Sequence, residues 1–148
     1  MTYRKNYEFP VLIDSTGLPN RIKVEQTHPS NLSGVISNEI RLIFIVDYNT
    51  GLPIFYKTIS GNITDITTLK TTINILSMYD INVKFILMDA GYYSLDNLKF
   101  LHELGISFLS RIKPNDCIYK NLVKQHAMEM MLNSEYVIKH NQRYLYCK

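Results

Sequence analysis

Two aspartates follow short apolar segments of the chain in the same way. Asp14 comes directly after residues 9–13, and Asp89 comes directly after residues 84–88. Apolar runs of this length are typical of buried strands. Ligand sites in α/β sheets form at the carboxyl ends of the strands. If the two strands are parallel neighbours, about 4.8 Å apart, the two carboxylates converge on one small volume.

Such a pair of carboxylates has a specific chemistry. Two carboxylates at this separation repel each other unless a proton or a cation lies between them. Mg²⁺ binds oxygen ligands, keeps several waters and uses one or two carboxylates together with phosphate oxygens. Paired metals in such sites activate a nucleophile and stabilise the leaving oxygen of phosphoryl transfer. The alternative is that each aspartate is a turn or capping residue, which is common at strand ends, and the pattern alone favours this structural role.

The elements that must position these aspartates can be predicted from the apolar pattern. Residues 15–20 are rich in turn formers and are expected to end the first strand, and residues 22–24 are expected to form a half-exposed strand or arm. Residues 40–46 are almost continuously apolar, which predicts a central strand covered on both faces. A hairpin connection at residues 47–51 should lead into a return strand at residues 54–59.

Two helices are expected on either side of the second aspartate strand. Apolar residues spaced by three, four and three positions indicate the first helix, which Asn62 or Thr64 could cap: Ile66, Leu69, Ile73 and Leu76. Ser94 is a good N-cap for the second helix, and Gly105 is its expected C-cap. Residues 106–109 predict a final buried strand.

The predicted fold class is α/β. The order is β-β-β-α-β-α-β, with three antiparallel strands first and parallel strands added by right-handed crossovers, which gives a mixed sheet with helices on its faces. After Arg111 the pattern weakens. Residues 122–131 suit a helix, and residues 144–147 resemble a strand with no partner inside the chain.

Composition indicates a packed protein and restricts its class. The chain has 148 residues, of which 46% are hydrophobic and 20% charged, so a folded core is expected. No apolar run approaches the ~20 residues that span a bilayer, and we expect a soluble, cytoplasmic protein. The two cysteines form no CxxC pair and indicate no zinc site. Net charge is +3, with the positive excess after Arg111. That region could contact nucleic acid, although a solvated basic surface is the more common explanation.

Three blocks of sequence together resemble a known family. They are Ile-Asp-Ser-Thr at residues 13–16, Gly-Asn-Ile-Thr-Asp at residues 61–65, and Leu-Met-Asp-Ala-Gly-Tyr-Tyr-Ser at residues 87–94. In combination and at this spacing they resemble bacterial insertion-sequence transposases with a DDE domain, of the insertion-sequence-four-like group. The likeness covers residues 10–111, about two-thirds of the chain.

The resemblance implies a ribonuclease-H-like fold and a metal-dependent reaction on DNA. Asp14 matches the first catalytic aspartate of the family and Asp89 the second, and both would bind Mg²⁺ or Mn²⁺. The implied activity is cleavage of a DNA strand by water, followed by strand transfer by a DNA 3′-hydroxyl. The implied partners are the transposon ends and the target DNA, with a homodimer in the intact family and no membrane. The implied location is the bacterial cytoplasm, at the nucleoid when DNA is bound.

One departure from the family pattern is important. The family's third carboxylate is a glutamate on a later helix, within Tyr-x₂-Arg-x₃-Glu-x₆-Lys, and no tyrosine here begins that pattern. Glu129 and Glu135 lie near the expected last helix, but their neighbours do not fit. We therefore expect a partial ribonuclease-H-like core at residues 9–112. Residues 113–148 would be the start of an insertion subdomain or a truncated C-terminal segment.

The missing third carboxylate leaves alternatives open. A chain of this kind is expected to be inactive alone. It could be a non-catalytic DNA-binding remnant, or a ribonuclease-H-like nuclease that hydrolyses without strand transfer. Two smaller expectations concern the motifs. Asp65 is expected to cap a helix or complement its positive end. Of Tyr92 and Tyr93, one is expected to pack inward, and either could touch DNA.

Overall fold

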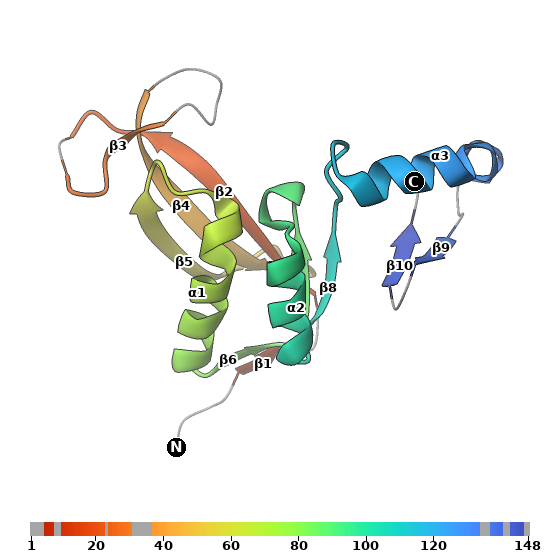
Figure 1. Ribbon diagram of the computed structural model, residues 1–148. Coiled ribbons are helices and arrows are strands. Elements are labelled where there is room, and N and C mark those ends of the chain that lie inside the picture. The colour runs from red at the N-terminus through yellow and green to blue at the C-terminus, as the bar shows by residue number, and fades with distance from the viewer. Residues whose placement is uncertain are drawn as a thin grey trace. The chain divides into compact units, whose positions relative to one another are not determined.

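The chain forms two compact units. The computed structural model describes residues 5–7, 10–22, 24–30, 37–133, 137–140 and 143–146 (Figure 1). The first unit is Met1–Arg111 and the second is Ile112–Lys148.

A six-stranded mixed sheet is the centre of the first unit. Its strands are β2 (Val11–Pro19), β3 (His28–Ser30), β4 (Ser37–Asp47), β5 (Pro53–Ser60), β7 (Phe85–Met88) and β8 (Ser107–Ser110). The order is β3-β4-β2-β7-β8, with β5 also paired to β4. Strands β2 to β5 pair antiparallel, whereas β7 and β8 add in parallel. The predicted order of main elements is therefore confirmed. Two short strands, β1 (Lys5–Tyr7) and β6 (Ile81–Val83), pair in parallel elsewhere.

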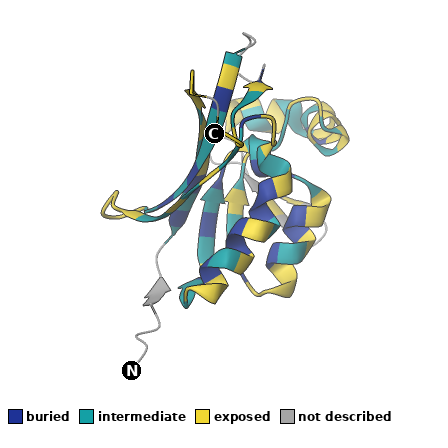
Figure 2. Ribbon diagram, turned by 90° about the vertical axis from the view of Figure 1, so that its left-hand side faces the viewer, coloured by how far each residue is buried: buried dark blue, intermediate teal, exposed yellow. Residues whose placement is uncertain are grey.

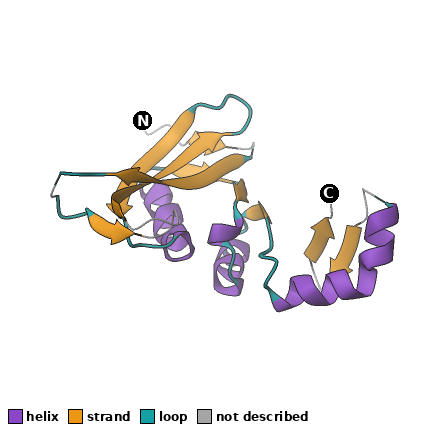
Figure 3. Cartoon of the chain, turned by 90° about the horizontal axis from the view of Figure 1, so that it is seen from above, coloured by secondary structure: helices purple, strands orange, loops and turns teal. Residues whose placement is uncertain are grey.

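Both α-helices of the first unit cover the same face of the sheet (Figure 3). They are α1 (Asp65–Met78) and α2 (Leu95–Glu103), and the 3₁₀ helix η1 (Ala90–Tyr92) precedes α2. Their buried stripes face the sheet (Figure 2). The core consists of side chains that are at most 5% exposed, from both layers: Val11, Ile13, Ile43, Ile45, Ile86, Leu69, Ile73, Leu76, Leu98 and Leu101. This burial of apolar surface is the main stabilising force of the unit.

Local sequence explains the ends of α2. The Ser94 side chain accepts a hydrogen bond from the Asn97 backbone amide, as predicted for an N-cap. After the helix, Gly105 has φ of +67°, a conformation that favours glycine. The hairpin at residues 47–51 is also confirmed, because Asp47 and Gly51 close a turn in which Gly51 has φ of +68°.

Four strand predictions were wrong in part. Residues 15–19 do not end the first strand, because they pair with β4 from Ser15↔Ile43 to Pro19↔Glu39. Strand β4 is central, but only one of its faces is fully buried, since both helices of the first unit lie on that face. Strand β8 is a partly exposed edge, with Leu109 57% exposed. Residues 22 and 24 belong to a connection rather than a strand, and Lys23 lies outside the described residues.

The second unit contains a helix and a hairpin. Helix α3 (Cys117–Leu132) begins at Asp116, whose side chain accepts a hydrogen bond from the Ile118 amide. Strands β9 (Val137–His140) and β10 (Arg143–Tyr146) pair antiparallel. The expectation of an unpaired last strand was therefore wrong, because its partner comes from the weakly patterned segment just before it. Cys147 lies outside the described residues, and Cys117 is an exposed free thiol. Across the described part of the chain, no helix has the length and apolar character needed to cross a membrane.

Candidate metal-binding active site

Parallel pairing of β2 with β7 brings Asp14 and Asp89 to neighbouring positions. The last pairs in the register are Leu12↔Leu87 and Ile13↔Met88. Asp14 is the next residue of β2, and Asp89 directly follows the end of β7. The backbone at Asp89 stays extended, with φ of −74° and ψ of 167°. Side chains alternate along extended strands. Since Ile13 and Met88 are buried, the two exposed aspartates share the opposite face.

Among the described residues, the carboxylate oxygens of Asp14 and Asp89 make few contacts, so most of them can bind a cation. Oδ1 of Asp14 accepts one hydrogen bond, from the Ser15 amide at 2.7 Å. Oδ1 of Asp89 lies 3.9 Å from a guanidinium nitrogen of Arg111, and these side chains are 60% and 85% exposed. An ion pair this exposed contributes about 0–1 kcal/mol, so it would yield readily to a cation. Two accessible carboxylates fit the oxygen-donor set of Mg²⁺ or Mn²⁺, which waters and phosphate oxygens would complete.

A third carboxylate does not join them within the described residues. No group of three or more His, Cys, Asp and Glu side chains that could hold a metal occurs among those residues. Glu129 is exposed on α3 in the second unit, and Glu135 lies outside the described residues.

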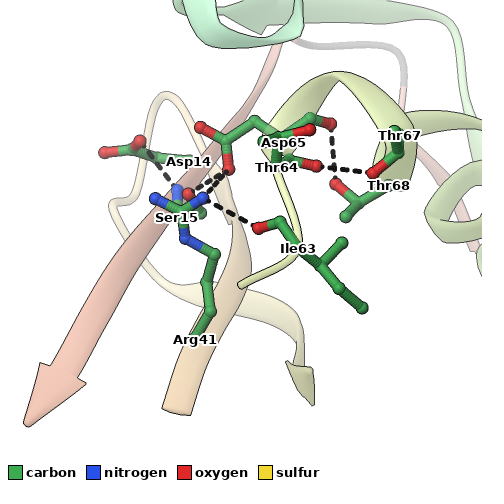
Figure 4. Close-up of polar contacts among 8 residues, drawn as sticks. All are labelled: Asp14, Ser15, Arg41, Ile63, Thr64, Asp65, Thr67 and Thr68. Carbon is green, nitrogen blue, oxygen red and sulfur yellow. Dashed lines mark hydrogen bonds and ion pairs between the residues drawn. The ribbon is translucent and has the colours of Figure 1, made fainter. Parts of the chain in front are cut away.

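A largely buried ionic cluster includes Ser15, the residue directly after Asp14. We call it the Asp65 cluster, and it comprises Ser15, Arg41 and Asp65 (Figure 4). The Ser15 hydroxyl donates a hydrogen bond to Oδ1 of Asp65. A guanidinium nitrogen of Arg41 lies 3.2 Å from the same oxygen and donates to the Ile63 carbonyl at 3.1 Å. The Arg41 and Asp65 side chains are only 11% and 19% exposed.

The cluster corrects the expected role of Asp65 as a cap. Thr64 is the N-cap residue of α1, and it makes no side-chain capping bond. Asp65 lies in the first turn, where its charge suits the positive end of the helix. However, its carboxylate is directed to Ser15 and Arg41. This pairing with Arg41 also argues against Asp65 as a metal ligand. The sequence offered only one sign of the cluster: Ser15 and Asp65 both belong to the family-like blocks.

Tyr92 lies against the same cluster. Its side chain is fully buried, and its hydroxyl has no hydrogen-bond partner of normal geometry among the described residues. Burial raises the pKa of Tyr92, and the negative charges of Asp65 and Asp14 raise it further, while Ser15 and Arg41 act in the opposite direction. Tyr93 is 8% exposed. Both tyrosines therefore pack inward, which confirms the expectation that one would and extends it to the second.

Solved structures of a transposase and of integrases are similar to this chain. A piggyBac transposase, in a synaptic complex with hairpin DNA, matches with a TM-score of 0.57 and 15% identity, over 78% of this chain and 25% of that chain. The integrase catalytic core of HTLV-2, in complex with magnesium, matches with a TM-score of 0.47 and 15% identity, over 82% and 72%. The integrase core of BIV matches with a TM-score of 0.45 and 13% identity, over 84% and 67%. The chain thus spans a quarter of the piggyBac protein's length.

Sequence comparison gives the family directly. No curated protein matches the chain. A family described as "Transposase DDE domain" matches residues 10–148, which include all three motif blocks. The mixed sheet, with three antiparallel strands followed by parallel additions, is a ribonuclease-H-like arrangement, which the chain shares with the piggyBac transposase. The chain belongs to the transposase DDE domain family.

Proposed function

We propose that this chain carries two of the three metal-binding carboxylates of a DNA transposase, Asp14 and Asp89. The single observation that supports this most strongly is their register. Each directly follows one member of the Ile13↔Met88 pair, which is the last pair between the parallel strands β2 and β7, and both side chains are exposed. The family to which the chain belongs depends on divalent metals. The same two aspartates are the ones that its motifs assign to the active site.

The chemistry of the site follows from these two side chains. Asp14 and Asp89 would hold Mg²⁺ or Mn²⁺ against a phosphate of DNA. The bound cation would supply Lewis-acid stabilisation of the charge that develops in phosphoryl transfer. The carboxylates fix the position of the scissile phosphate relative to the attacking hydroxyl, which is a large part of catalysis in such reactions. Cleavage by water and transfer by a DNA 3′-hydroxyl can use the same arrangement.

The proposed partners are the transposon ends and the target DNA, with a second copy of the protein in the active assembly. The piggyBac protein that shares the fold was solved with DNA. We further assign residues 9–112 to the catalytic core and residues 113–148 to a subdomain added after β8. The division of the chain between Arg111 and Ile112 supports this assignment.

DNA binding measured with and without a divalent metal tests the proposal. Fluorescence anisotropy of a labelled duplex in Ca²⁺, which supports binding without cleavage, is compared with the same titration in EDTA. We expect Ca²⁺ to strengthen binding about tenfold for the wild type, because the metal links the carboxylates to a phosphate. Asp14→Asn and Asp89→Asn should lose this gain.

Asp80→Asn is the matched control, since Asp80 lies at the opposite end of α1 and has φ of 56°, which asparagine tolerates. An equal gain in all four proteins would contradict the proposal. No gain in any of them, with DNA still bound, would favour the alternative of a non-catalytic DNA-binding protein. That alternative is motivated by the lack of a third carboxylate among the described residues. In Mn²⁺, a joined product from an added 3′-hydroxyl strand would distinguish strand transfer from hydrolysis alone.

A further inference from the structure

The Asp65 cluster connects the two chain segments that carry the proposed metal ligands. On one side, Asp65 accepts a hydrogen bond from Ser15, the residue directly after Asp14. On the other side, Oδ2 of Asp65 packs against Gly91, two residues after Asp89. A Cβ atom added at Gly91 would lie 2.7 Å from that oxygen. One carboxylate therefore touches both segments.

The contact is fixed rather than adaptable. The Arg41 guanidinium holds Asp65 from β4, at 3.2 Å, and also binds the Ile63 carbonyl just before α1. Both charged side chains are largely buried, so removing either one would leave the other without its counter-charge. Buried pairs of this kind are costly to break, because removing one partner leaves an uncompensated buried charge.

Hydrogen bonds from Asn97 also join α1 to the η1 turn. The Asn97 side-chain amide donates to the Ile66 carbonyl in the first turn of α1 and to the Tyr92 carbonyl in η1, each at 2.8 Å. Asn97 is 2% exposed. The first turn of α1 is therefore bonded to the η1 turn after Asp89 through Asn97, and to the β2 strand after Asp14 through Asp65.

We infer that Asp65 is a positioning residue, which holds the Ser15 segment of β2 and the Gly91 turn at a fixed separation and thereby sets the spacing of Asp14 and Asp89. Asp65 itself binds no metal, since its charge is matched by Arg41. The part of this inference that concerns metal binding rests on the proposed function, whereas the structural coupling does not.

Hydrogen exchange tests the coupling without any metal. In Asp65→Asn, we expect amide exchange to rise about tenfold or more in two separate segments at once, residues 15–17 of β2 and residues 91–93. The Tyr92 and Tyr93 amides are suitable reporters, because they donate to the Asp89 and Ala90 carbonyls. Asp80→Asn should exchange as the wild type does. A rise confined to the first turn of α1, or spread evenly over the unit, would overturn the inference.

Two milder variants keep the test decisive if Asp65→Asn folds poorly. Ser15→Ala removes only the hydroxyl that reaches Asp65, and Gly91→Ala displaces the carboxylate without changing any charge. Each should raise exchange in both segments, although by less than Asp65→Asn. A response limited to the substituted segment would contradict the coupling.

Mn²⁺ affinity then separates this inference from the proposed function. For the folded proteins, Asp65→Asn should bind Mn²⁺ several-fold more weakly than the wild type but more tightly than Asp14→Asn. Wild-type affinity in Asp65→Asn, alongside weak binding by Asp14→Asn, would overturn positioning while leaving the metal site intact. Equal binding by Asp14→Asn and the wild type would contradict the metal site, and the exchange result would still decide the coupling.

Discussion

At the scale of single residues, the site contains two buried polar groups without a hydrogen-bond partner among the described residues, Nε of Arg41 and the Tyr92 hydroxyl. The Tyr92 hydroxyl is buried beside the Asp65 cluster without a hydrogen-bond partner among the described residues. Sequence patterns predicted Asp14 and Asp89, because an aspartate that follows an apolar run can be recognised from the sequence alone. They could not predict the Ser15, Arg41 and Asp65 contacts, since these join three elements whose meeting depends on the tertiary fold.

Tyr92→Phe should therefore stabilise the protein. A buried hydroxyl without a partner costs about 1–3 kcal/mol, so we expect the free energy of unfolding in urea at pH 7 to rise by about 1 kcal/mol. Tyr56→Phe, at a 71% exposed position, should have no effect. A loss of stability in Tyr92→Phe would mean that the hydroxyl has a partner, such as a bound water.

The pH dependence of the same variant has a defined sign. The pKa of Tyr92 is raised in the folded state, so folding favours the protonated form. This contribution to stability is present below the unfolded pKa of about 10 and is lost as the pH rises above it. Between about pH 9 and pH 11, a range that spans the unfolded pKa, the free energy of unfolding should fall more for the wild type than for Tyr92→Phe. Parallel losses in the two proteins would show that Tyr92 does not contribute.

At the scale of elements, the order of strands and helices was predictable and their extents were not. Periodicity located α1 and α2, and the Ser94 cap placed the start of α2 correctly. The continuation of β2 through residues 15–19 was missed, because Gly17 and Pro19 are turn formers in isolation. Pairing with β4, which depends on distant residues, overrides that local preference.

Asn97 provides the test at this scale, because it joins α1, η1 and α2 through two backbone carbonyls. Asn97→Ala should lower the free energy of unfolding by about 2 kcal/mol, since one buried and one partly buried carbonyl lose their donor. Asn74→Ala, at an exposed position within α1, should leave stability unchanged or slightly raised. Equal effects of the two substitutions in urea denaturation would contradict the role given to Asn97.

At the scale of the whole molecule, the sheet topology brings together two residues from distant parts of the chain. Three antiparallel strands and a connection through α1 place β7 beside β2, and only this placement makes Asp14 and Asp89 neighbours. Net charge and composition predicted a packed protein compatible with nucleic acid. They could not predict the second unit's hairpin, whose strands are weakly patterned.

The most direct test of the central claim is a Mn²⁺ titration of the free protein, followed by electron paramagnetic resonance. Because Asp14 and Asp89 would share one ion, Asp14→Asn and Asp89→Asn should each weaken Mn²⁺ binding by about tenfold or more. The double variant should bind Mn²⁺ only slightly more weakly than either single variant. Asp80→Asn should match the wild type. Undiminished Mn²⁺ binding in the two single variants would contradict a metal site at Asp14 and Asp89.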